Sequence, residues 1–193
     1  SIGEALTNIV WAPLEKEIKS ISLSANWMWA CKNPGEDARL YAAVKACSDF
    51  AITLGINIPT GKDSLSMKQK YADRQVIAPG TVIISAAAHC IDISQIIEPV
   101  IKSGEGDLFY INMSCSPFET GGSSFAQILN KVGDKTPSIA DAIKFKTAFN
   151  TVQQLIRNGH IVSGHDIGSG GLITTLLEMC FSDPQAGADF DLS

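Results

Sequence analysis

Apolar side chains recur at helical and strand spacings through the first half of the chain. The acidic pair Glu36-Asp37 after Pro34-Gly35 is typical of a helix start, and Gly55 is a natural helix stop. Pro79-Gly80 interrupts the last β-branched stretch. In order, the pattern predicts a helix over residues 2–10, a strand over 21–29, a helix to about 54, and strands over 58–67 and 76–90.

The pattern changes after Cys90, where a short amphipathic connection and a glycine-containing turn introduce a new series. The series consists of a strand over residues 108–113, a helix after Gly121-Gly122-Ser123-Ser124, a helix over 138–158, a strand over 160–164, a helix over 172–181 and the start of a strand at 189–193. We therefore expect a mixed α+β fold in two layers, with one unit over residues 1–90 and another over 91–193. The opening helix and the closing strand have no lead-in or partner, so we expect both ends to be cuts in a longer chain.

Composition narrows the class of protein. With 193 residues, 45% of them hydrophobic, the chain can bury a substantial core. A net charge of −5 argues against nucleic acid or an anionic membrane as a partner. The longest apolar run, around residues 82–88, is far too short to span a bilayer. We expect a cytoplasmic protein that binds small ligands.

The five cysteines are scattered and form no C-x-x-C pair, so neither zinc nor a redox dithiol is indicated. Cys115 lies in a polar Ser-Cys-Ser-Pro loop where a nucleophile can be imagined. Incidental thiols are far commoner, and we interpret all five as reduced packing residues.

Glu4 and Asn8 are four residues apart and share one face of the opening helix. A carboxylate and an amide oxygen at this spacing suit Mg²⁺, which prefers oxygen ligands. From the spacing alone, an ordinary solvated helix face remains the favoured interpretation.

The stretch from Pro59 to Lys68 holds two lysines, a carboxylate and three hydroxyl side chains, but it lacks the spacing of a Walker loop. Lys62 could neutralise a phosphate, and Asp63 could orient that lysine or bind a metal. An edge strand with solvated lysines is the alternative.

The stretch from His165 to Leu172 predicts a glycine-rich turn between a strand and a helix. Such a turn exposes backbone N–H groups that favour anions, and Asp166 at the strand end is placed to hold the accompanying cation. A tight turn in which Asp166 only caps the helix is equally consistent. No orienting partner for His165 is evident, so we expect a structural histidine and assign no catalytic residue.

Taken together, these stretches resemble the formylglycinamidine ribonucleotide synthetase family in its large single-chain form, across essentially all 193 residues. The most specific matches are Gly3-Glu4-Ala5-Leu6-Thr7-Asn8, Leu23-Ser24-Ala25-Asn26-Trp27-Met28, Pro34-Gly35-Glu36-Asp37-Ala38, Gly61-Lys62-Asp63-Ser64-Leu65-Ser66-Met67-Lys68 and His165-Asp166-Ile167. The resemblance implies the aminoimidazole ribonucleotide synthetase-like fold. Residues 1–90 would be the C-terminal part of one N-terminal domain, and residues 91–193 the N-terminal part of its C-terminal partner, in the second half of the enzyme.

The resemblance also implies a site. Glu4, Asn8 and Asp166 match the family's magnesium ligands, and Lys62, Asp63 and Gly168 would contact the nucleotide, ATP or ADP. The family usually has Ser and Asp where this chain has Gly168 and Ser169, so only the backbone at 168 is expected to serve.

By the same resemblance, the parent ligase uses ATP and glutamine to convert formylglycinamide ribonucleotide to the amidine in purine biosynthesis. Its partners would be a nucleotide, a phosphoribosyl substrate and the rest of the parent chain, including a glutaminase domain and the first synthetase half. The second-half nucleotide site could be structural, and the isolated fragment inactive. The alternative is a non-catalytic nucleotide-binding or dimerisation module of the same superfamily, whose exposed edges would let it self-associate.

Overall fold

The computed structural model describes residues 1–102, 104, 106–114, 118–184 and 187–191. Its Cα positions divide into two compact units. The first contains residues 1–9 and 14–89, and the second contains residues 10–13 and 90–193. The division between residues 89 and 90 is next to the expected boundary, whereas the assignment of residues 10–13 to the second unit was not expected.

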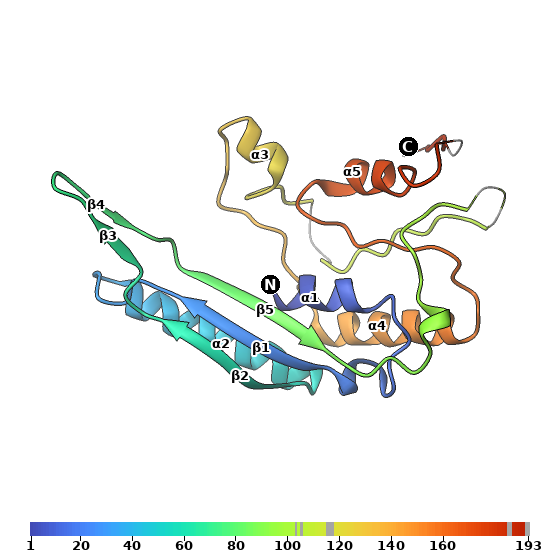
Figure 1. The fold of residues 1–193 in the computed structure, drawn as a ribbon, viewed down its shortest axis with the longest axis horizontal. Helices are drawn as coiled ribbons and strands as arrows, with labels where there is room; N and C mark the ends of the chain where they lie inside the picture. Colours follow the sequence, from blue (N-terminus) through green and yellow to red (C-terminus); the bar gives the residue numbers. More distant parts are fainter. Residues whose placement is uncertain (103, 105, 115–117, 185–186, 192–193) are drawn as a thin grey trace. The chain divides into compact units, whose positions relative to one another are not determined.

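The first unit is built on a three-stranded sheet in the order β2-β1-β5 (Figure 1). Strand β1 (Ser22–Met28) runs parallel to β2 (Asn57–Ser64), and helix α2 (Glu36–Leu54) makes the crossover between them. Strand β5 (Thr81–Ala87) pairs antiparallel with β1 on its other side. Gly55 ends α2 in the left-handed conformation with φ 76°, as its sequence position predicts.

Helix α1 (Ile2–Ile9) packs along β5 in the same unit. Its Leu6 is fully buried, and so are Leu23 of β1 and Leu54 at the end of α2. A short 3-10 helix, η1 (Glu17–Ser20), then leads into β1. The core of the unit is therefore formed by the apolar face of α1, the inner residues of the sheet and the last turn of α2.

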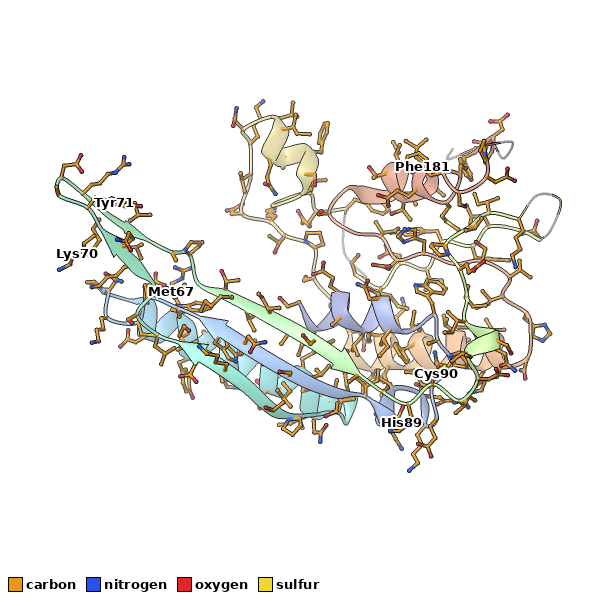
Figure 2. The ribbon with its side chains drawn as sticks, in the orientation of Figure 1. Met67, Lys70, Tyr71, His89, Cys90 and Phe181 are labelled. Carbon is orange, nitrogen blue, oxygen red and sulfur yellow. The ribbon has the colours of Figure 1, made fainter. Side chains whose placement is uncertain are left out.

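A small hairpin in the first unit was not expected. Strands β3 (Lys68–Lys70) and β4 (Gln75–Ile77) pair antiparallel, and the Tyr71 N–H donates to the Arg74 carbonyl at 2.7 Å across the turn. Lys70 and Tyr71 lie toward the hairpin tip in Figure 2. Both strands are exposed along their whole length, so no buried alternation marks them in the sequence.

The second unit contains the 3-10 helix η2 (Ile93–Gln95) and helices α3 (Ser124–Ile128), α4 (Ala142–Arg157) and α5 (Gly171–Glu178). The carboxylate of Asp141 caps α4 by accepting from the N–H groups of Ile143 and Lys144, each at 2.9 Å. The buried face of α4 contributes five residues to the core of this unit: Phe145, Phe149, Val152, Gln153 and Ile156.

Residues 10–13 are anchored in the second unit by Gln153, whose side chain is fully buried. Its Nε2 donates to the carbonyls of Val10 and Ala12 at 2.5 and 2.9 Å. The Trp11 ring lies against Gly164, where a Cβ atom would overlap the ring. The Gln153 hydrogen bonds and the Trp11 contact thus fix residues 10–13 in the second unit.

Three strand expectations are not met in the described residues. Residues 108–113, 160–164 and 189–191 belong to no helix or strand. Residues 192–193 lie outside the described part. An apolar run becomes a strand only when another strand takes up its backbone hydrogen bonds, and the described residues supply none. The expected mixed α+β class is confirmed.

Among the described residues, no helix combines the length and the apolar character needed to cross a bilayer.

Candidate functional site

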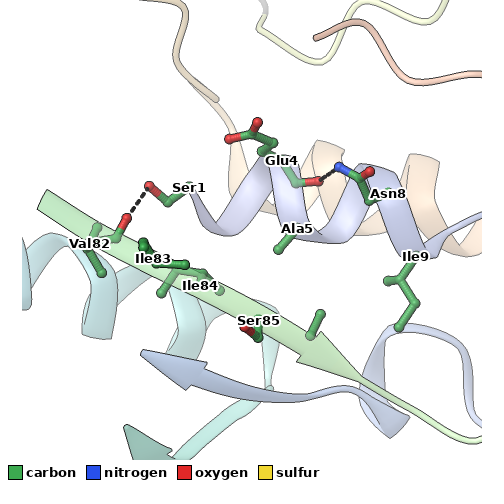
Figure 3. Close-up of a pocket in the computed structure, with 10 residues that line it drawn as sticks. Ser1, Glu4, Ala5, Asn8, Ile9, Val82, Ile83, Ile84 and Ser85 are labelled. Carbon is green, nitrogen blue, oxygen red and sulfur yellow. Dashed lines mark hydrogen bonds between the residues drawn. The ribbon is translucent and has the colours of Figure 1, made fainter. Parts of the chain in front are cut away.

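An open groove of about 620 Å³ runs between α1 and β5 in the first unit (Figure 3). Five consecutive residues of β5, from Val82 to Ala86, line it together with residues of α1. Side chains that alternate on a strand cannot all face one side, so the groove follows the free edge of β5. Ser1 already reaches this edge, because its Oγ donates to the Val82 carbonyl at 3.4 Å.

Glu4 and Asn8, the two expected magnesium ligands of α1, are exposed and line this groove. The Asn8 Nδ2 donates to the Glu4 carbonyl at 2.8 Å (Figure 3). Because the amide nitrogen of Asn8 makes this bond, its Oδ1 takes no part in it. An amide oxygen and a carboxylate are thereby presented from one helix face, and both are donor types that Mg²⁺ accepts.

Lys62 and Asp63 lie elsewhere in the same unit. They occupy β2, which β1 separates from β5, and neither lines the groove. Both are exposed, and the Lys62 ammonium donates to the Ser64 hydroxyl at 3.1 Å. Because they are consecutive in a strand, their side chains point to opposite faces of the sheet. Their role in nucleotide binding stays a prediction.

Asp166 lies in the second unit, in the segment that leads to the glycine-rich turn. Its side chain is 17% exposed. Helix α5 has Gly170 as its N-cap and no side-chain cap bond. The alternative that Asp166 caps this helix is therefore wrong, and the carboxylate is not used at the helix end.

Asp166 and its neighbour His165 are instead held from α5. The Thr175 hydroxyl donates to the Asp166 carbonyl at 3.4 Å. His165 Nδ1 is 3.5 Å from Oδ1 of Asp166, and its Nε2 is 3.5 Å from Oε2 of Glu178. The sequence did not identify these two carboxylates as neighbours of His165, and the structural role of this histidine stays a prediction. Glu178 was missed because its contact depends on how α5 folds back onto residues 165–166.

The glycine-rich turn also contacts the first residue of α3. The Ser124 N–H donates to the Ser169 carbonyl at 3.0 Å, and their hydroxyls are 3.3 Å apart. Ser169 stands where the family was expected to have Asp, and a carboxylate there would meet the Ser124 hydroxyl. Gly168, the expected nucleotide contact, is exposed with open space around its Cα.

The three expected magnesium ligands thus fall in different units, Glu4 and Asn8 in the first and Asp166 in the second. Their joint site stays a prediction. Within the described residues, no group of three His, Cys, Asp or Glu side chains is arranged to hold a metal ion. Four of the cysteines are free thiols, as expected, and Cys115 lies outside the described residues.

Comparison with protein families assigns both parts of the chain. Residues 1–89 match the FGAR-AT PurM_N-like domain, and residues 104–193 match the AIR synthase related protein, C-terminal domain.

Two curated relatives match nearly the whole chain. The probable phosphoribosylformylglycinamidine synthase, chloroplastic/mitochondrial, of Arabidopsis thaliana is 40% identical over 196 residues, which cover 100% of this chain. The phosphoribosylformylglycinamidine synthase of Homo sapiens is 39% identical over 184 residues, which cover 94% of it. The chain spans only 14% of the length of each relative.

Solved structures agree on the fold. T. maritima PurL complexed with AMPPCP aligns with a TM-score of 0.52 and 10% identity, over 94% of this chain and 25% of that one. T. maritima PurL complexed with ATP aligns with a TM-score of 0.51 and 10% identity, over 92% and 25%. At this identity the alignments show the fold alone. Through its two matched domains and its near 40% identity over essentially the whole length, the chain belongs to the phosphoribosylformylglycinamidine synthase family.

Proposed function

We propose that this chain is part of an ATP- and glutamine-dependent ligase that converts formylglycinamide ribonucleotide to formylglycinamidine ribonucleotide in purine biosynthesis. The names of the relatives support the reaction, and the nucleotide-bound structural neighbours support a nucleotide ligand. Because the chain spans a small share of those relatives, we propose that it supplies a magnesium–nucleotide site rather than the whole activity.

The observation that carries the proposal is the orientation of Asn8. Its Nδ2 is bonded to the Glu4 carbonyl, so its Oδ1 and the exposed Glu4 carboxylate are available from the same helix face. Asp166 would add a second carboxylate from the other unit. A bound Mg²⁺ would offset negative charge on the phosphates. The chain's own residues would supply oxygen ligands and the exposed backbone of Gly168.

Calorimetric titration of the chain with Mg-ADP tests this function. We expect the native sequence to bind Mg-ADP. Glu4→Ala and Asp166→Ala should each bind it at least about tenfold more weakly, because each substitution removes an expected Mg²⁺ ligand. Asp134→Ala, which removes an exposed carboxylate of the second unit, is the matched control. Binding that both ligand changes leave intact would refute the site, and no binding by the native chain would refute an autonomous nucleotide site.

One observation favours a second candidate, a dimerisation module. Strand β5 has the sequence Thr-Val-Ile-Ile-Ser-Ala-Ala, with no charge, proline or glycine, and it is an edge strand. Natural sheets usually protect such edges. Sedimentation at rising concentration tests this role: a mass that doubles would support self-association, and a constant monomer mass would exclude it.

A further inference from the structure

The free edge of β5 directs half of the strand's backbone groups away from its own sheet. The Trp29 N–H, just after β1, donates to the Ser64 carbonyl of β2 at 2.9 Å, so the odd-numbered residues of β1 direct their backbone groups toward β2. The even-numbered residues of β1 then bond to β5, and their partners there are the odd-numbered residues from 81 to 87. The even-numbered residues of β5 are left to face outward.

Val82, Ile84 and Ala86 are these outward-facing residues, and all three line the groove beside α1. The Ser1 hydroxyl agrees with this direction, because it donates to the Val82 carbonyl at the edge of the strand (Figure 3). In the described part of the chain, the outward backbone groups of Ile84 and Ala86 have no hydrogen-bond partner. An added strand would take up such alternate groups.

The two edges of this sheet differ in their protection. β2, the opposite edge, contains a proline and two charged residues: Pro59, Lys62 and Asp63. Natural sheets use proline and charged side chains to keep an edge from pairing with another strand. β5 contains neither, and its Ile83 is 52% exposed. The contrast within one sheet indicates that the edge of β5 pairs with a further strand.

We propose that an extended segment from the rest of the parent chain adds a strand to the free edge of β5 and occupies the groove beside α1. The chain spans only 14% of the length of its curated relatives, so a chain of that length has many further segments to supply the strand. A second copy is disfavoured, because two copies that each carry a net charge of −5 repel each other. This inference rests on the proposed place of the chain in a longer ligase, and not on magnesium or nucleotide binding.

The groove also determines the kind of segment that fits. Ala5 and Ile9 of α1 line it with apolar surface, so the added strand should carry apolar side chains that pack against them. Glu4 and Asn8 line the same groove. The added strand would therefore run beside both expected magnesium ligands of α1.

Hydrogen exchange of single backbone amides, resolved by mass spectrometry with electron-transfer fragmentation, tests the proposal without any substitution. In the 193-residue chain, the Ser85 amide should exchange slowly because it bonds to β1, whereas the Ile84 and Ala86 amides should exchange near the rate of a free peptide. In the full-length parent protein, we expect the Ile84 and Ala86 amides to exchange at least about 100-fold more slowly than in the 193-residue chain.

A matched pair of proline substitutions separates the two directions of the strand. Ala86→Pro removes an outward N–H, and Ser85→Pro removes an N–H that bonds to β1. In the 193-residue chain, Ala86→Pro should leave Tm within about 2 °C of the native value, whereas Ser85→Pro should lower it by at least about 5 °C. In the parent protein, Ala86→Pro should speed exchange at Ile84 at least about tenfold, because the added strand loses a hydrogen bond.

Exchange at Ile84 and Ala86 that is equally fast in the chain and in the parent protein would overturn the proposal. Slow exchange of these amides in the 193-residue chain, at a concentration where sedimentation gives twice the monomer mass, would overturn it too and assign the edge to a second copy. An equal loss of Tm in both proline variants would refute the backbone direction on which the proposal depends. A failure of the nucleotide site would show only in the Mg-ADP titration, so the two failures can be told apart.

Discussion

Replacing Gln153 by Leu tests whether one buried amide anchors residues 10–13 in the second unit. The side chain is fully buried, and its Nε2 donates to the carbonyls of Val10 and Ala12. Leucine has a similar size but no donor, so both carbonyls would lose this bond inside the protein. Each buried acceptor left without a partner costs about 1–3 kcal/mol, and the added apolar burial returns about 1 kcal/mol. For the two carbonyls together we expect a loss of about 1–5 kcal/mol in the free energy of unfolding.

Urea unfolding followed by tryptophan fluorescence measures that loss, because Trp11 lies on the anchored segment. Gln154→Leu is the matched control, since Gln154 is the next residue of α4 and is exposed. A surface change of this kind should stay within about 0.5 kcal/mol. Equal effects of the two substitutions, or a loss below about 0.5 kcal/mol for Gln153→Leu, would refute the anchoring role.

Three further outcomes follow from single positions. Gly164→Ala would place a Cβ inside the Trp11 ring, so we expect a loss of about 1–3 kcal/mol from overpacking, measurable as a lower Tm; an unchanged Tm would mean that the ring moves freely. Burial raises the pKa of the Cys47 thiol, so at pH 8 it should react with iodoacetamide more slowly than an unhindered peptide thiol, and equal rates would contradict this. Hydrogen bonds from the side chain and the backbone N–H of Ser94 lower the pKa of Asp92. The folded pKa lies below the unfolded one, so the stabilisation is present above the unfolded pKa and is lost as pH falls through the folded pKa. Asp92→Asn should therefore reduce the pH dependence of stability in this acid range, and an unchanged pH profile would refute the assignment.

Helices of this chain were predictable because their signals are local. The acidic first turn of α2, its stop at Gly55 and the periodicity of α4 are all contained in short windows of sequence. The apolar runs at 108–113 and 160–164 misled the prediction, because strand formation depends on a distant partner and not on the run itself. The β3–β4 hairpin was missed for the opposite reason, since it is polar and exposed and carries no buried alternation.

In the candidate site, too, the local features could be predicted from the sequence and the long-range contacts could not. The common helix face of Glu4 and Asn8 follows from their spacing of four, and the structure adds the Asn8 hydrogen bond that orients the amide. The contact between His165 and Glu178 joins the segment before the glycine-rich turn to the last residue of α5, so no local pattern marks it. Local spacing could place ligand types on a helix, but it could not identify the neighbours that orient them.

The anchoring of residues 10–13 also affects when the second unit can fold during synthesis. Val10 and its partner Gln153 are 143 residues apart in the sequence. Ribosomes add roughly 5–20 residues per second, so an emerging Val10 waits on the order of 10 s before Gln153 is even synthesised. Throughout that interval Trp11 cannot reach Gly164, and its ring stays open to chaperones or to other nascent chains. The second unit can therefore fold completely only after Gln153 and Gly164 have been made, with a segment that was made well before them.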